Sequence, residues 1–187
     1  MEYKKESLTK YLDDLSAKLA APGGGSAAAM AAAMAASLLE MVLNFTIGKP
    51  KYAEHEAELK GILKKCTGLR LKFLELVDLD VLAYSSKNMR DALNIPFMTA
   101  RLSCEGIKFC LPLITKSNVN LISDVAVAAV FFEAAFVSAR FNVDINLKIL
   151  GDKELAKNIR KELSQKEKLV RRIRSTTEVR VGKVIGR

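Results

Sequence analysis

The sequence predicts an all-α fold, an antiparallel bundle of about six helices that forms a single domain over residues 1–187. Glycine and proline are scarce, with 10 and 4 residues, and aromatic residues make up 6% with no tryptophan, so a β-sandwich is disfavoured. Half of the residues are hydrophobic and 27% are charged, which is typical of a globular chain. Apolar residues recur at helical spacing in long segments without proline.

Three helical segments are expected in the first half of the chain. Ser7 can cap a helix that runs to about Leu19 and carries its leucines on one face. Ser26 stands where the cap of an alanine-rich helix belongs, and this helix should run to about Thr46. The third segment, 52–93, keeps a helical period without proline, so it is one long helix or two collinear ones.

The second half of the chain should start a new helix at Pro96. This helix is expected over 97–115, with Pro112 kinking it or ending it early. A polar loop over 116–122 follows. Ser123 is then placed to cap the next helix.

The last two expected helices differ in character. The helix over 124–150 is apolar around most of its circumference and should lie in the middle of the fold. The helix over about 152–182 is amphipathic and basic, since residues 151–187 hold twelve Lys and Arg against five Asp and Glu. They carry +7 of the net charge of +9. A basic helix can bind polyanions but is more often a solvated face, so nucleic acid is not favoured as a partner.

The apolar helices exceed what a bundle of this length can bury, which predicts an intertwined homodimer. A membrane span over 26–45 is the alternative that length allows. The alanine content of this segment, Glu40 within it and the glycines before it argue against a span.

The polar chemistry of the chain favours neither metal binding nor export. His55 is the single histidine, and the three cysteines form no Cys-x-x-Cys pair, so neither a metal site nor a disulfide framework is indicated. The N-terminus is charged and lacks the apolar core of a signal peptide. A cytoplasmic location is expected.

Residues 22–26, Pro-Gly-Gly-Gly-Ser, are the sharpest local motif. Three glycines leave the backbone open, and the helix that follows directs its free N–H groups toward them. A carboxylate or a polar ring system could bind there, although a turn that permits close packing is the reading that the motif alone favours. The motif lacks the lysine of a phosphate-binding loop, so a nucleotide is not expected.

Asp78 and Asp80 are the candidate catalytic carboxylates. Residues two apart on a helix point in nearly opposite directions, so at most one of them should face a given cavity. The same-face neighbours of Asp80 are apolar and include no cation, whereas Asp78 has Glu75 beside it. Burial among apolar residues would raise the pKa of Asp80 toward the range that suits proton transfer near neutrality. A structural hydrogen bond to another helix is an equally favoured alternative.

Two amides, Asn142 and Asn146, interrupt the apolar helix over 124–150. They are four residues apart and share a face, so they could make paired contacts to a ligand. Hydrogen bonds between helices are the commoner use of such residues.

Five motifs occur in a specific order between about Tyr11 and Leu150. They are Pro22-Gly23-Gly24-Gly25-Ser26-Ala27-Ala28-Ala29, Met41-Val42 with Thr46-Ile47-Gly48-Lys49, Val77-Asp78-Leu79-Asp80, Asn118 with Ser123-Asp124, and Phe141-Asn142-Val143-Asp144-Ile145-Asn146. Each is weak alone, but together and at these spacings they resemble the cyclodeaminase/cyclohydrolase family of folate enzymes. This family includes the C-terminal domain of formiminotransferase-cyclodeaminase and stand-alone bacterial methenyltetrahydrofolate cyclohydrolases.

The resemblance implies an all-helical homodimer that binds a folate substrate, with or without a polyglutamate tail, in a cleft near the subunit interface. It makes Asp80, the second aspartate of its motif, the catalytic residue, and it implies no metal or other cofactor. The positions that would line or support the folate cleft are Gly23, Gly24, Gly25, Ser26, Lys49, Tyr52, Asn118, Asp124, Asn142 and Asn146. Lys49, Lys51 and the basic tail could attract the glutamates of a folate.

Two reactions are compatible with this resemblance. The expected one is hydrolysis of 5,10-methenyltetrahydrofolate to 10-formyltetrahydrofolate, because the chain carries no separate formiminotransferase domain. The alternative is the cyclodeaminase reaction, in which 5-formiminotetrahydrofolate closes to the methenyl compound and releases ammonia. An alternative from another functional class is a non-catalytic helical dimer that binds polyanions through residues 171–174. Val81 replaces the small residue usual after the second aspartate and Ser117 replaces a glycine, and both departures bear on substrate preference.

Overall fold

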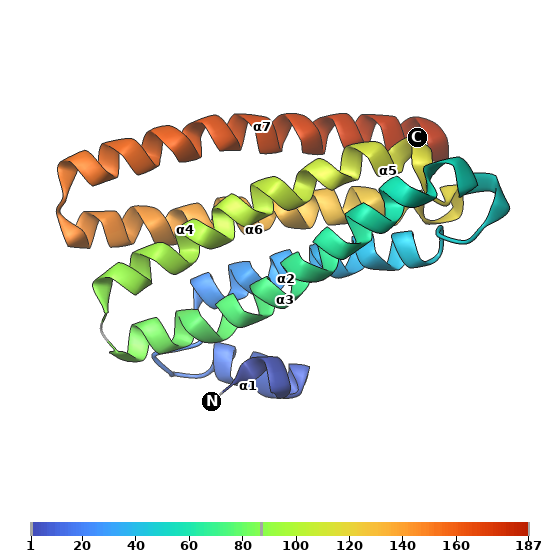
Figure 1. The fold of residues 1–187 in the computed structure, drawn as a ribbon. Coiled ribbons are helices and arrows are strands. Elements are labelled where there is room, and N and C mark those ends of the chain that lie inside the picture. Colours follow the sequence, from blue (N-terminus) through green and yellow to red (C-terminus); the bar gives the residue numbers. More distant parts are fainter. Residues whose placement is uncertain (1, 87, 187) are drawn as a thin grey trace.

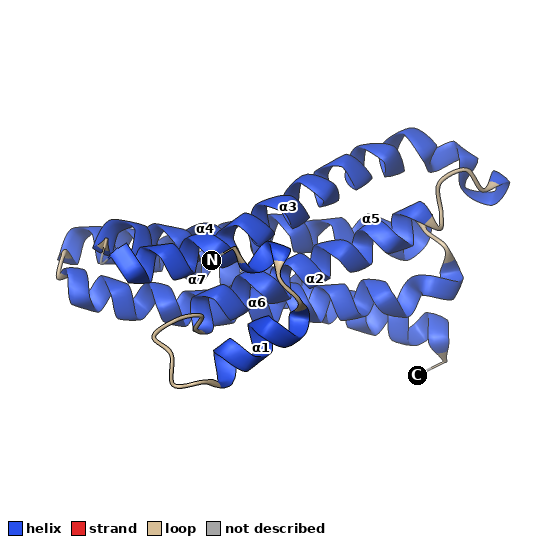
Figure 2. Ribbon diagram, turned by 90° about the horizontal axis from the view of Figure 1, so that it is seen from below, coloured by secondary structure: helices blue, strands red, loops and turns tan. Residues whose placement is uncertain are grey.

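The computed structural model describes residues 2–86 and 88–186. In these ranges the regular structure is entirely helical, with no strand (Figure 2). The α-helices are α1 (Leu8–Ser16), α2 (Gly24–Asn44), α3 (Glu56–Ser86), α4 (Met89–Gly106), α5 (Cys110–Lys116), α6 (Ile122–Leu150) and α7 (Lys153–Ile185). The 3-10 helices are η1 (Tyr3–Lys5), η2 (Pro50–His55), η3 (Ile107–Phe109) and η4 (Val119–Leu121). Since α5 continues α4 after η3, the expected all-α bundle of about six helical segments is confirmed.

The most apolar helices, α2 and α6, form the central pair of the bundle (Figure 1). Helix α6 also packs against α4 and α7, while α2 packs against α3. By length and composition alone, Gly24–Asn44 and Val119–Leu150 are each apolar enough to cross a membrane. In this structure they pack side by side within the bundle, which is the position expected for core helices.

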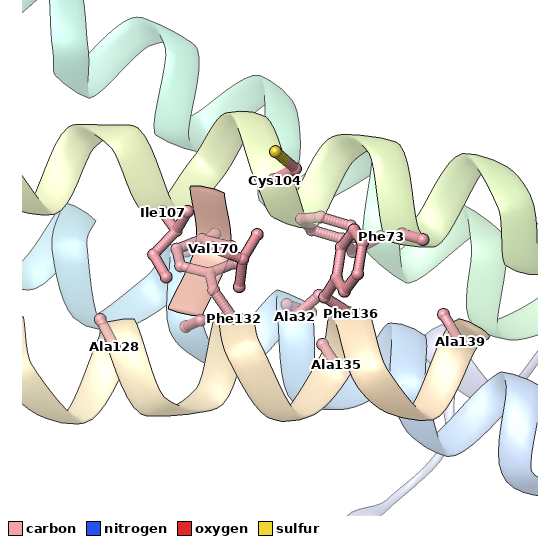
Figure 3. Packing of buried hydrophobic residues seen from close by; sticks show 14 of the residues in the cluster. Ala32, Phe73, Cys104, Ile107, Ala128, Phe132, Ala135, Phe136, Ala139 and Val170 are labelled. Atoms are coloured by element: carbon pink, nitrogen blue, oxygen red, sulfur yellow. The ribbon is translucent and has the colours of Figure 1, made fainter. Parts of the chain in front are cut away.

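Small alanine side chains on α2 and α6 pack beside the phenylalanine rings of α3 and α6 (Figure 3). The Phe73, Phe132 and Phe136 rings are fully buried between α3, α4 and α6. A Cβ atom at Gly106 would lie 2.5 Å from the Phe132 ring, so this glycine lets α4 approach α6.

Two predicted helix starts are confirmed. The Ser7 side chain accepts a hydrogen bond from the Lys10 N–H at 3.0 Å and caps α1, although the helix ends at Ser16 rather than near Leu19. Asp152 caps α7 in the same way, and Gly151 before it has a φ of 75°, in the left-handed region that glycine tolerates.

The cap predicted at Ser26 is wrong. The N-cap is three residues earlier, at Gly23, and α2 begins at Gly24. Ser26 therefore lies inside the first turn, where its N–H and its hydroxyl both have partners from other elements. The Asp80 carboxylate of α3 accepts a hydrogen bond from a backbone N–H of the first turn, which is the role predicted for the serine side chain.

The predicted start of a helix after Pro96 is also wrong, because α3 ends at Ser86 and α4 already begins at Met89. Asn88 accepts hydrogen bonds from the backbone N–H groups of Arg90 and Asp91, and α4 starts there with Pro96 in its interior. Proline has no N–H for the carbonyl four residues before it. That carbonyl, on Ala92, instead accepts a hydrogen bond of 2.6 Å from the Asn146 side chain of α6.

Two smaller expectations shift by a turn or less. Pro112 lies in the first turn of α5, after η3 has interrupted the helix expected over 97–115. The loop expected over 116–122 contains η4, and α6 starts at Ile122, so Ser123 is a helical residue rather than a cap.

Candidate active site

A cavity of about 320 Å³ lies where the N-terminal end of α2 meets α3, α4 and α6. We call it the glycine cavity because the three consecutive glycines form one wall. It is lined by Ala20, Ala21, Gly23, Gly24, Gly25, Asp80, Tyr84, Ala92, Asn142, Ile145, Asn146 and Ile149. Of the two candidate aspartates, only Asp80 faces it, as the helical geometry predicts.

The Asp80 carboxylate lies against the first turn of α2. Its Oδ2 atom accepts a hydrogen bond of 2.8 Å from the Ser26 N–H. A Cβ atom on Gly25 would lie 2.1 Å from Oδ1 and 2.7 Å from Cγ, distances that no side chain can adopt. A glycine at position 25 is therefore required for the carboxylate to reach the Ser26 N–H in the first turn of the helix.

The surroundings of Asp80 suit proton transfer. Burial raises the pKa of this carboxyl above its ordinary value, and the hydrogen bond from the Ser26 backbone N–H acts in the opposite direction. The direction is the one that the apolar neighbours of Asp80 predict. A carboxyl group with a raised pKa can accept a proton and return it at a pH closer to neutrality.

Tyr11 supports this arrangement from α1. It is 3% exposed, and its hydroxyl lies 3.2 Å from the hydroxyl of Ser26. Burial raises the pKa of Tyr11, the hydrogen bond with Ser26 lowers it, and the charge of Asp80 raises it. Ser26 thus connects Tyr11 to the carboxylate, and it supports the cavity rather than lining it.

Asn142 and Asn146 both line the glycine cavity, and Asn142 lies against Gly24. The Asn142 amide group donates to the Ser138 carbonyl of its own helix at 3.0 Å and lies 3.4 Å from where a Cβ atom of Gly24 would be. Asn146 makes the interhelical bond to Ala92, so its position depends on Pro96. Both amides are held by protein contacts at the edge of an open space.

The remaining predicted residues lie at the opposite end of α2. Tyr52 accepts a hydrogen bond of 3.3 Å from the Val119 N–H, and the Asn118 N–H donates to the Thr46 hydroxyl at 2.9 Å. These contacts fasten the connection after α2 to the one before α6. Lys49 is exposed and Asp124 is half-buried. Because α2 has 21 residues, this end is about 30 Å from the glycine cavity of the same chain.

Asp78 faces away from the glycine cavity. It is 4% exposed, and the charge near it comes from Lys4, whose ammonium group lies 3.7 Å from Oδ2. The sequence predicts that Asp78 has a charged neighbour on its own helix, Glu75. The cation closest to Asp78 is instead Lys4, which is distant in sequence.

Some cavity residues were not predicted from the sequence. Tyr84 lies one helical turn after Asp80, and its side chain remains 62% exposed. Ile145 and Ile149 continue the face of Asn142 and Asn146, and both are more than half exposed. The helical period places all three beside a predicted residue, so spacing alone could have found them.

The basic helix offers less free charge than its sequence suggests. Arg171 pairs with Glu167, and Arg174 pairs with Glu133 at 2.8 Å and with Glu178. Ile173, between these arginines, is 4% exposed. Arg172 is exposed.

Within the described ranges, no group of three or more His, Cys, Asp or Glu side chains could hold a metal ion. The three thiols, on Cys66, Cys104 and Cys110, are buried and free. Burial raises the pKa of the Cys66 thiol to about 12.

Fold and site together define an all-helical protein with one partly buried carboxylate, that of Asp80, set against a glycine-rich helix terminus. The sequence profile of the formiminotransferase-cyclodeaminase family matches residues 7–87 and 85–165. The chain therefore belongs to this family of folate one-carbon enzymes.

Three relatives show how closely the chain follows known proteins. It is 34% identical to a methenyltetrahydrofolate cyclohydrolase of Methylorubrum extorquens, over 84% of this chain and 87% of that one. It is 26% identical to the formimidoyltransferase-cyclodeaminase of Rattus norvegicus, again over 84% of this chain but only 34% of the longer rat protein. The crystal structure of a formiminotetrahydrofolate cyclodeaminase from Thermotoga maritima superposes with a TM-score of 0.93 and 28% identity, covering 98% of this chain and 100% of that one.

Proposed function

We propose that this enzyme hydrolyses 5,10-methenyltetrahydrofolate to 10-formyltetrahydrofolate, with Asp80 as its acid/base catalyst. The observation that carries the proposal is the single carboxylate of raised pKa that faces the glycine cavity. A volume of about 320 Å³ lies at the lower end of the range for small-molecule pockets. The cyclohydrolase at 34% identity aligns over nearly its whole length, which favours this reaction.

The reaction needs one proton acceptor that can become a donor. Water adds to the cationic methenyl carbon of the substrate, and ionised Asp80 takes a proton from that water. The bond between this carbon and N5 then breaks, its electron pair goes to N5, and protonated Asp80 delivers a proton there. The new hydroxyl group loses its proton to form the formyl carbonyl, and this proton passes through Asp80 to solvent. Such acid/base catalysis contributes about 10²- to 10⁴-fold in rate.

The geometry of α2 helps Asp80 in both protonation states. The Ser26 N–H holds Oδ2, so the carboxylate keeps one orientation and leaves Oδ1 for the reacting groups. Asn142 and Asn146 line the same cavity, where their amide groups suit the polar edge of a pterin ring. Tyr84 supplies an exposed aromatic face for the substrate's ring systems.

The second candidate is the cyclodeaminase reaction, which the match to the Thermotoga maritima enzyme favours. There N10 of 5-formiminotetrahydrofolate attacks the formimino carbon, and ammonia leaves. Asp80 would move a proton from N10 to the leaving amine. Both reactions pass through the same carbon centre, so one cavity can serve either.

The test is the loss of the near-ultraviolet absorbance of 5,10-methenyltetrahydrofolate, in a buffer where uncatalysed hydrolysis is slow. Wild type should remove it rapidly, and Asp80→Asn should lose about 10²-fold or more in kcat. Glu75→Gln is the matched control, because Glu75 is an exposed carboxylate on the same helix that pairs with Lys72. No loss with folded wild type would reject the cyclohydrolase, and formation of the methenyl compound from 5-formiminotetrahydrofolate would then establish the deaminase.

We further propose that the active form is a homodimer in the cytoplasm. Seven exposed apolar side chains, which we call the apolar stripe, belong to α2, its C-cap residue and α6, and each is at least 41% exposed. It consists of Met34, Phe45, Val127, Val130, Phe141, Ile145 and Ile149. Such a face is the kind that a second copy covers. The buried free thiols suit a reducing compartment.

The same dimer would explain the residues at the far end of α2. The stripe reaches the glycine cavity through Ile145 and Ile149 and extends to Phe45 near Lys49. If the two copies pack antiparallel about a two-fold axis, Lys49 and Asp124 of one subunit approach the glycine cavity of the other. Mixing Asp80→Asn dimers with Lys49→Met dimers should then restore activity, because one cavity of each heterodimer has both residues intact. No recovery after subunit exchange would reject this arrangement.

The non-catalytic alternative receives less support. Its main residues, Arg171 and Arg174, are already neutralised by glutamates. An enzyme that depends on Asp80 and is indifferent to these arginines would exclude it.

A further inference from the structure

We propose that Asp78 is a positioning residue, which ties the N-terminal segment to α3 and so holds one wall of the glycine cavity in place. The N-terminal segment comprises residues 2–22. This inference rests on the proposed function for its effect on turnover, but its structural part can be tested without any activity.

The N-terminal segment is attached to the bundle at few points. Figure 1 shows α1 outside the long helices, below the ends of α2 and α3. On α1, Leu8 and Leu12 are at least half exposed, although the sequence predicts that they share a packing face with Tyr11. Tyr3, Tyr11 and Pro22 of the segment are buried, Leu15 is partly buried against the core, and the two tyrosine rings meet edge to face at 5.4 Å. The leucine face of α1 therefore contributes only part of the anchoring.

The polar anchor of the segment is Asp78. The Lys4 backbone N–H donates to Oδ1 at 3.3 Å, and the Lys4 ammonium group lies 3.7 Å from Oδ2. This carboxylate is 96% covered, and Oδ2 has no hydrogen-bond partner in the described structure. A buried carboxylate depends strongly on its remaining partners, so the approach of Lys4 stabilises both the charge and the contact between η1 and α3.

The segment that Asp78 anchors ends in the glycine cavity. Ala20 and Ala21 line it directly before the glycine turn. Tyr11 of the same segment contacts Ser26, whose N–H holds Asp80. Release of the segment from Asp78 would therefore loosen a wall of the cavity and the contact behind the catalytic carboxylate.

The two aspartates of the motif thus have different roles. Because they are two residues apart on α3, one faces the cavity and the other faces the N-terminal segment. Asp80 acts on substrate, whereas Asp78 acts through the segment that covers it.

The test compares Asp78→Asn and Lys4→Met with Lys5→Met. Lys5 is the matched control because its ammonium group pairs with Glu2 and its side chain is 72% exposed. Hydrogen exchange measured by mass spectrometry reports the mobility of residues 8–22. Steady-state kinetics with 5,10-methenyltetrahydrofolate report KM and kcat.

Asp78→Asn and Lys4→Met should each speed exchange in residues 8–22 about tenfold and raise KM about tenfold, with kcat within about threefold of wild type, since each removes one member of an ion pair to a buried carboxylate. The double variant should add little to either single one, and Lys4→Arg should keep wild-type behaviour because it retains the cation. Unchanged exchange in folded variants would overturn the anchor. Faster exchange with unchanged KM would overturn the positioning role. If wild type does not turn over this folate, the proposed reaction fails, while the exchange result still decides whether Asp78 holds the segment.

Discussion

The candidate active site requires a residue without a side chain at position 25. In Gly25→Ala, the new Cβ atom would lie 2.1 Å from Oδ1 of Asp80, whereas ordinary contact begins near 3.4 Å. The carboxylate must therefore move by about 1.3 Å. It would lose the 2.8 Å hydrogen bond from the Ser26 N–H as it moves.

The expected loss follows from that displacement. Misplacing a catalytic group by ~1 Å costs about 10²-fold in rate, which is about 2.7 kcal/mol of activation free energy. The fold should survive, because alanine is favoured over glycine in a helix by about 0.5–1 kcal/mol and this gain offsets part of the local strain. Kinetics of methenyltetrahydrofolate hydrolysis and thermal unfolding by circular dichroism measure the two effects separately.

Gly68→Ala is the matched control for this variant. Gly68 lies inside α3, and a Cβ atom there would meet nothing within 4 Å. It should keep wild-type kcat and unfold at a slightly higher temperature. If folded Gly25→Ala retained wild-type kcat, the contact between the glycine turn and Asp80 would have no catalytic importance, and this reasoning would be refuted.

Three further predictions concern the same cavity. Tyr84→Ala should raise KM about tenfold with little change in kcat, because an exposed ring adds about 0.5–1.5 kcal/mol of stacking, and Tyr84→Phe should behave as wild type. Asn146→Ala should lower the free energy of unfolding by about 1 kcal/mol, because the Ala92 carbonyl loses its donor. Adding Pro96→Ala restores an N–H for that carbonyl and should recover most of the loss in denaturant unfolding, whereas additive losses would contradict this account. Asp80→Asn should raise the free energy of unfolding at neutral pH. Because the pKa of Asp80 is raised in the folded state, the wild-type protein loses stability as pH rises above the ordinary value of 3.8. The advantage of Asp80→Asn over wild type should therefore disappear below that pH.

The sequence predicts best what depends on neighbours along the chain. The all-α class, the cap at Ser7 and the orientation of only one of the two aspartates toward a cavity follow from patterns of residues three or four apart. The raised pKa of Asp80 follows from the same local neighbours.

The errors arise where another element supplies a partner. Ser26 does not cap α2, because Asp80 from α3 accepts the N–H that a cap would take. Pro96 lies inside α4, because Asn146 from α6 bonds the carbonyl that proline leaves free. Residue spacing also does not predict how far Lys49 lies from the glycine cavity of the same chain. This distance, about 30 Å, is set by the length of α2.

The central claim is that Asp80 moves the protons of the reaction. The most direct test is the pH dependence of methenyltetrahydrofolate hydrolysis in single-turnover experiments with wild type and Asp80→Asn. Wild-type turnover should decrease as pH falls through a pKa above 3.8, because the carboxylate that accepts the proton of water is then lost. Asp80→Asn should stay near the uncatalysed rate at every pH. Turnover by folded Asp80→Asn at the wild-type rate, with the same pH dependence, would contradict the account.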